Sequence, residues 1–173
     1  MTTIAEKKEI RSRDPQIFEA FLDCLRRESD VLENLLKSFE LQREALIKNN
    51  LQEFVRNLEE QQILVWEADK RERERKAFIE KMYPDRPTEE ISFTEILAVA
   101  PAGLKPALEE ERRHMRNLVN KINLYRDTNK RLINKSLEIL NYRIRLLTQW
   151  SEHFYNQNAE TEKQIPKLID KQV

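Results

Sequence analysis

Residues 106–158 read PALEEERRHMRNLVNKINLYRDTNKRLINKSLEILNYRIRLLTQWSEHFYNQN and form the longest uninterrupted pattern of the chain. After Pro106 this stretch contains neither proline nor glycine, and its apolar residues recur at the spacing of one helical face. We therefore expect one helix over 106–158, about 80 Å long at 1.5 Å per residue. The members of its apolar stripe are Leu108, Met115, Leu118, Val119, Ile122, Tyr125, Leu132, Ile133, Leu140, Ile144, Leu147 and Phe154.

Two shorter helices are expected before it. Asp14 followed by Pro15 is typical of a helix start, and a heptad repeat of apolar residues then predicts a helix over 15–47. Asn50 with Glu53 forms a plausible capping pair for a second helix over 51–82. The short joint between them makes an antiparallel hairpin. The repeat of the first helix is Phe18, Leu25, Leu32, Phe39 and Leu46, and the expected stripe of the second is Leu51, Phe54, Val55, Leu58, Val65, Ile79 and Met82.

Residues 83–105 contain four prolines and Gly103, the only glycine of the chain, and are expected to form a linker. Ser92 with Glu95 favours one short helix inside it, over 93–100. The fold class that follows is all-α: an elongated antiparallel three-helix bundle or coiled coil with a long C-terminal helix. We expect a single domain over residues 1–173 that ends in a polar tail from residue 159.

Composition excludes several classes of protein. One glycine is too few for the loops that cradle phosphates in nucleotide-binding folds. The 31 basic and 31 acidic residues cancel, which argues against a general nucleic-acid binder. No apolar run is long enough for membrane insertion, and the first residues lack the apolar core of a signal peptide. A single cysteine, Cys24, suits a reducing compartment, so a cytoplasmic protein is expected.

No set of residues with catalytic spacing is evident. Glu111 and His114 form one Glu-x-x-His step, whereas a di-iron bundle needs two such steps and two more inward glutamates. Zinc would need partners that Cys24 does not have. We therefore expect no enzyme, no metal and no other cofactor.

The unequal lengths of the helices predict a surface. If the third helix runs antiparallel to the second, it is longer by about twenty residues, or roughly 30 Å, and this overhang has no partner in the chain. An exposed amphipathic helix is a surface for binding or self-association. Its large side chains are Ile139, Leu140, Ile144, Leu146, Leu147, Trp150, Phe154 and Tyr155.

Two expectations concern the inside of the bundle. Gln61, Gln62 and Asn129, the last just before Leu132 and Ile133, lie on or beside apolar stripes, where polar residues usually fix helix register. At the other end, antiparallel pairing sets Phe18, Phe21 and Leu22 opposite the charged residues 69–76. We expect the linker and the third helix to cover these side chains.

The segment Asn129-Lys-Arg-Leu-Ile-Asn-Lys-Ser-Leu-Glu-Ile-Leu140 resembles the late helix of the FlgN-like flagellar export chaperones. The order of the helices and the proline-containing linker are similar too, over roughly residues 17–156. Two departures are Arg126, where the family often has asparagine, and the absence of glycine after Tyr155.

The resemblance implies a cytoplasmic chaperone of the flagellar type III export system. Such chaperones bind the C-terminal helical segments of the hook–filament junction proteins, prevent their premature assembly and deliver them to the export gate. The overhang is then the cargo-binding surface, with Trp150 as its main anchor. The residues assigned to it are Leu140, Ile144, Leu147, Trp150, Phe154 and Tyr155.

Two alternatives stay open. The first is a structural coiled-coil protein that forms a homodimer through the same overhang and has no export role. The second is a catalytic or metal-binding four-helix bundle that uses the linker helix as its fourth element.

Overall fold

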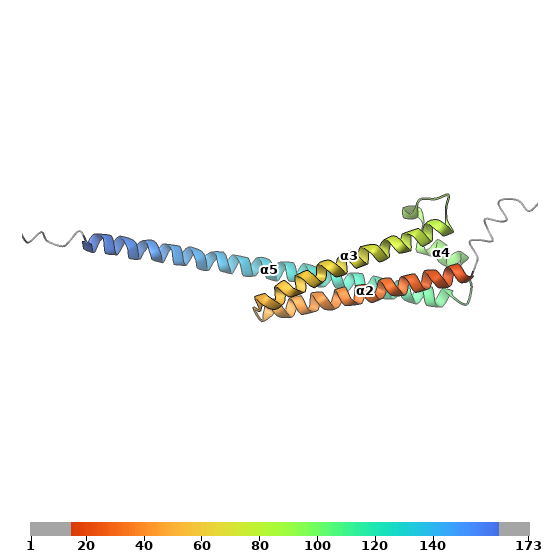
Figure 1. Ribbon diagram of the computed structural model, residues 1–173, viewed down its shortest axis with the longest axis horizontal. Coiled ribbons are helices and arrows are strands. Elements are labelled where there is room, and N and C mark those ends of the chain that lie inside the picture. Colours follow the sequence, from red (N-terminus) through yellow and green to blue (C-terminus); the bar gives the residue numbers. More distant parts are fainter. Residues whose placement is uncertain (1–14, 163–173) are drawn as a thin grey trace, which may run out of the picture. The chain divides into compact units, whose positions relative to one another are not determined.

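The computed structural model describes the backbone of residues 15–162 and the side chains of residues 15–151. This part of the chain is all-α and has no strand (Figure 1). It divides into two compact units, and the boundary falls inside the last helix, between Asn129 and Lys130. The elements are α2 (Pro15–Ile47), α3 (Leu51–Met82), the short 3-10 turn η1 (Thr88–Glu90), α4 (Phe93–Val99) and α5 (Lys105–Glu162).

Local side-chain chemistry sets several of these bounds. The Asn50 side chain accepts a hydrogen bond from the Glu53 backbone N–H (3.2 Å) and starts α3. Asn49, with φ of 53°, turns the chain between α2 and α3. At α4 the Ser92 hydroxyl and the Glu95 carboxylate each satisfy the other's backbone N–H, which is a complete capping box. Helix α5 ends four residues later than the predicted end at Asn158.

Interhelical contacts fix the directions of the helices in the first unit. Between α2 and α3, Glu28 pairs with Arg75 and Gln42 with Gln61, so the two helices are antiparallel. Between α2 and the first part of α5, Ser29 bonds to Glu111, Glu33 to His114, and the Phe39 carbonyl to Asn129. In these three contacts the residue number on α5 rises as the residue number on α2 rises. This part of α5 therefore runs parallel to α2 and antiparallel to α3.

One end of this unit, which we call the apolar end, has a conventional hydrophobic core. The Phe21 ring lies 6.4 Å from both Phe78 and Phe93, measured between ring centroids. Helix α4, its flanks and the start of α5 cover the aromatic side chains of α2, as the sequence predicts. The buried members are Phe18, Phe21, Leu22, Leu25, Ile79, Met82, Ile91, Ile96, Ala100 and Leu108.

The charged residues 69–76 do not lie opposite these aromatic side chains, contrary to the expected pairing. Arg75 meets Glu28, seven residues after Phe21, because the α2–α3 register places Phe78 beside Phe21. The charged stretch therefore packs against the next two turns of α2, where a carboxylate is available to pair with it.

The end near the α2–α3 turn, which we call the polar end, is different. Its buried layer consists of Gln42, Asn57, Gln61 and Asn129. Neighbouring buried positions on α2 carry the small residues Ser38 and Ala45. Because the side chains of Ser38 and Ala45 are small, the helices can approach each other closely at these positions.

The expected stripe of α3 is wrong in its first half. Leu51, Val55, Leu58 and Val65 are exposed, and Leu51 is the most exposed of them at 72%. The face turned toward α2 carries Asn57 and Gln61 instead, because these amides are four residues apart and share one side of the helix. On α2, Leu32, Phe39 and Leu46 of the expected repeat are only half-buried.

Candidate functional site

The second unit presents apolar side chains along α5. Every described side chain from Asn134 to Ser151 is exposed. The two most exposed large apolar residues among them are Leu147 (68%) and Trp150 (67%). Of the six residues that the sequence assigns to cargo binding, Leu140, Ile144, Leu147 and Trp150 are among these exposed side chains. The side chains of the other two, Phe154 and Tyr155, lie outside the described residues.

Five of the apolar residues form a continuous ridge. Ile133, Leu137, Leu140, Ile144 and Leu147 follow one another at alternating intervals of four and three residues, which is the seam of a coiled coil. We call these five residues the α5 stripe. Trp150 comes three residues after Leu147 and widens the surface by about 60° around the helix. A surface of this width accommodates the apolar face of one partner helix.

The surroundings of the α5 stripe are basic. Over residues 130–147 five basic residues face one acidic residue, which gives a net charge of +4. The acid, Glu138, makes an exposed ion pair with Lys135 (3.4 Å). An amphipathic helix with acidic flanks would therefore be attracted to this face more strongly than a basic one.

Asn129 is 2% exposed and links α5 to α2. Its side-chain amide donates to the Phe39 carbonyl (2.9 Å) and to the Gln42 Oε1 atom (2.8 Å). The two residues grouped with it by sequence, Leu132 and Ile133, are half-buried. The hydrogen bonds of Asn129 can form in one axial position of α5 only, which supports the proposed role in register.

Sequence reasoning missed two members of the polar end. Gln42 receives the amide of Asn129 and donates to the Gln61 Oε1 atom (3.4 Å), and Asn57 is fully buried. The oxygens of Asn57 and Asn129 and the amide nitrogen of Gln61 are buried without a hydrogen-bond partner. A buried amide atom without a partner costs about 1–3 kcal/mol, so this layer is weaker than an apolar one. The available signal was the spacing of Asn57 and Gln61 on one helical face.

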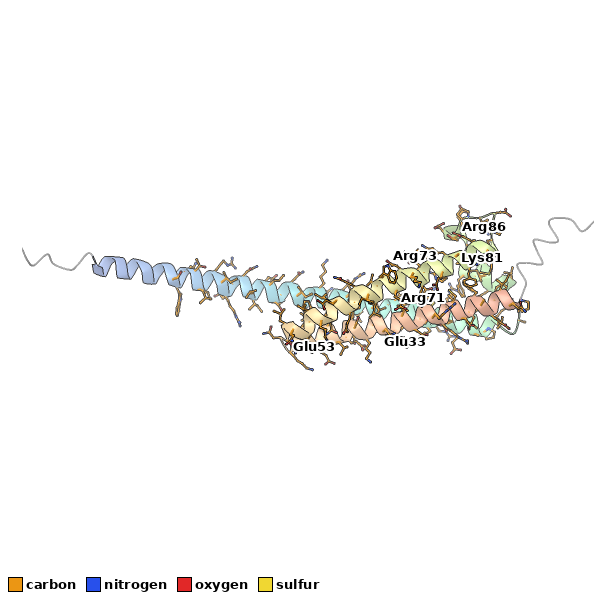
Figure 2. The ribbon with its side chains drawn as sticks, in the orientation of Figure 1. Glu33, Glu53, Arg71, Arg73, Lys81 and Arg86 are labelled. Atoms are coloured by element: carbon orange, nitrogen blue, oxygen red, sulfur yellow. The ribbon has the colours of Figure 1, made fainter. Side chains whose placement is uncertain are left out.

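A buried ion pair lies between the two ends. The Arg75 Nε atom is 2.8 Å from the Glu28 carboxylate, whose side chain is 8% exposed. Burial raises the pKa of Glu28, and Arg75 opposes this shift through its charge and its hydrogen bond without cancelling it. On the same part of α3, Arg71, which is labelled in Figure 2, pairs with Glu67 and Glu74. This stretch is thus charged yet packed into the bundle.

The residues singled out as metal ligands are engaged elsewhere. The His114 Nε2 atom on α5 lies 3.0 Å from the Glu33 Oε1 atom on α2, and the Glu111 carboxylate accepts a hydrogen bond from the Ser29 hydroxyl. Cys24 is fully buried in α2, and burial raises the pKa of its thiol. Within residues 15–151 no three His, Cys, Asp or Glu side chains gather closely enough to hold a metal ion.

None of the helices in the described part of the chain combines the length and the apolar character needed to cross a bilayer.

Comparisons with known proteins give one result. No curated protein and no solved structure matches the chain. The model of the FlgN family, described as FlgN protein, matches residues 17–163. The matched region contains all of α3, α4 and α5 and nearly all of α2. A match of this extent shows that the chain belongs to the FlgN family, whose members are flagellar export chaperones.

Proposed function

We propose that this chaperone binds the C-terminal helical segments of the hook–filament junction proteins in the cytoplasm. It keeps these segments from assembling prematurely and delivers their proteins to the export gate of the type III system. The observation that carries the proposal is the α5 stripe, which is exposed from Leu137 to Leu147, with the exposed Trp150 beside it. A cargo helix laid along it would bury both apolar faces, and exposed apolar surface of this continuity is uncommon without a partner.

Trp150 is the expected main anchor. A tryptophan combines a large apolar area with few rotatable bonds, and residues of this kind account for most of the binding energy in helix-in-groove complexes. Leu147 lies three residues before Trp150, about 60° around the helix, and Ile144 lies three residues before Leu147. The basic flank selects among cargo helices, because opposite charges on the rim raise the association rate.

The test is the combined change Ile144→Asp, Leu147→Asp and Trp150→Asp. Binding to the C-terminal segment of a junction protein should weaken by at least about 100-fold, since one hot-spot residue contributes roughly 3 kcal/mol. The readout is calorimetric titration, with helical circular dichroism as the check on folding.

A matched control makes the same change of net charge on the other side of the same helix. Lys135→Asp with Gln149→Asp lowers the net charge by three, and both exposed side chains lie about 160° around the helix from the middle of the α5 stripe. These changes should leave the affinity within a few-fold of the unmodified protein. Equal affinity of this control and the triple variant would contradict the proposal.

A further inference from the structure

Helix α3 carries a second exposed apolar ridge, which the cargo surface does not use. Leu51, Val55, Leu58, Gln62 and Val65 follow one another at intervals of four and three residues, and all five are exposed. We call these five residues the α3 stripe. Trp66, 64% exposed, lies beside it. The ridge is turned away from Asn57 and Gln61, the face that α3 uses against α2.

The α3 stripe and the α5 stripe have the same pattern. Each has five positions in the same alternation of four and three residues, spread over 15 residues. Each is also extended in the same series by a charged residue: Asp69 four residues after Val65, and Lys130 three residues before Ile133. Two helices with a shared heptad period can interdigitate their side chains along the whole length of the seam.

The charges of the two ridges are opposite. Over residues 51–69 five acidic residues face one basic residue, a net charge of −4, whereas residues 130–147 have +4. Like faces would repel each other in an α3–α3 or an α5–α5 contact. An α3–α5 contact joins unlike charges and covers both apolar ridges at once.

The complementary helix comes from a second copy of the chain. Both stripes present exposed apolar side chains in surroundings of opposite charge, so the α3 stripe of one copy and the α5 stripe of another can serve as partners. In a twofold dimer each copy supplies one α3 stripe and one α5 stripe, so the contact is made twice.

We propose that the α3 stripe is a docking site for the α5 stripe of a second copy, in a reciprocal dimer that covers the cargo surface when no cargo is bound. Two seams of about two heptads each make a small interface, so the dimer forms at micromolar rather than nanomolar concentration. The covering of the cargo surface rests on the proposed function, whereas the dimer itself does not.

Charge reversal in two variants tests the pairing. The first, Glu59→Lys with Asp69→Lys, makes the surroundings of the α3 stripe less acidic, and the second, Lys130→Glu with Arg143→Glu, makes those of the α5 stripe less basic. All four side chains are exposed, so both variants should fold. In sedimentation equilibrium the unmodified protein should associate to twice its 20.9 kDa, and each variant alone should need at least tenfold higher concentration. An equal mixture of the two variants should recover part of the association, because one seam of the mixed dimer joins an unaltered α3 ridge to an unaltered α5 ridge, which neither variant can form by itself.

A matched variant with the same change of net charge lies on α2. Asp30→Lys with Glu40→Lys alters two exposed residues outside both ridges and should dimerise like the unmodified protein. If the first variant stayed fully dimeric by itself, α3 would not be in the interface. A monomeric unmodified protein at 100 µM, or a mixture that fails to associate, would also overturn the inference.

Cargo distinguishes this inference from the proposed function. A cargo peptide that binds α5 should dissociate the dimer and leave a one-to-one complex. A dimer that ignores the peptide counts against the proposed function and leaves the dimer standing. A peptide that binds a chain that is monomeric throughout overturns the dimer and supports the proposed function.

Discussion

The apolar end and the polar end of the first unit are built from the same helices and held together differently. At the apolar end, Phe18 and Phe21 are buried among side chains from α3, α4 and α5. At the polar end, Gln42, Gln61 and Asn129 are joined by hydrogen bonds, and some of their polar atoms have no partner. The difference indicates that the apolar end supplies most of the free energy of folding, whereas the polar end fixes the axial position of α5.

The largest expected effect is at the apolar end. Phe21→Ala removes a fully buried ring that contacts two helices, and should lower the free energy of unfolding by about 4 kcal/mol. Urea unfolding followed by circular dichroism measures this change. Val119→Ala, at an exposed position of α5 outside both stripes, should cost less than about 0.5 kcal/mol. Similar losses for the two variants would mean that the apolar end does not dominate stability.

The buried ion pair between the two ends should come next. Arg75→Met leaves the Glu28 carboxylate buried without its cation and should cost about 3 kcal/mol at pH 7. The pKa of Glu28 is already raised by burial, and the loss of Arg75 raises it further. The folded protein then binds this proton more tightly than the unfolded chain. Its contribution to stability is therefore present at low pH and is lost as the pH rises through the folded pKa.

Unfolding in urea at pH 5 and pH 7 checks that direction. Arg75→Met should lower the free energy of unfolding by less at pH 5 than at pH 7. Arg73→Met, at an exposed neighbouring position, is the control and should change stability little at either pH (Figure 2). A loss that is the same at both pH values would show that Glu28 is not buried as a charge.

At the polar end, substitutions should lower or raise the stability of the fold depending on how many of the buried amides they replace. Asn129→Ala leaves the Gln42 Oε1 atom without the Asn129 donor and removes the additional donor to the Phe39 carbonyl, and should cost about 2 kcal/mol. Replacing Gln42, Gln61 and Asn129 together by leucine removes donors and acceptors alike and should raise the midpoint of thermal unfolding. A lower midpoint in the triple variant would show that the amide layer stabilises the fold.

The smallest effect should come from a helix cap. Ser92→Ala removes the hydroxyl that receives the Glu95 backbone N–H and should cost about 1 kcal/mol, since α4 packs on the apolar end. Ser92→Asp retains an acceptor at the same place and should restore most of the loss in thermal unfolding. An alanine variant as stable as the unmodified protein would show that packing alone holds α4.

The sequence was informative about where helices begin and end, because those points depend on local chemistry. Asn50, Ser92 and the prolines of the linker act on the backbone next to them. The exposed ridge on α5 could also be anticipated, since Ile144 and Leu147 continue an apolar series beyond the length of the shorter helices. The long helix itself needed only the absence of glycine and proline.

The buried face of α3 could not be anticipated in the same way. Hydrophobic periodicity identifies the apolar side of a helix, and burial usually follows it. In the first half of α3 the apolar side and the buried side are different sides of the helix. Asn57 and Gln61 face α2, while Leu51 and Val55 face outward. Which side turns inward depends on hydrogen bonds between residues far apart in sequence, such as Gln42 and Gln61.

The burial of Cys24 provides a probe of the apolar end that needs no engineering. It is the only thiol of the chain, it is fully buried within one turn of Phe21, and burial makes its reactive thiolate form scarcer. A thiol reagent can therefore modify it only when the surrounding helices separate. The rate of labelling in native buffer thus counts these opening events, with cargo or a second copy present or absent.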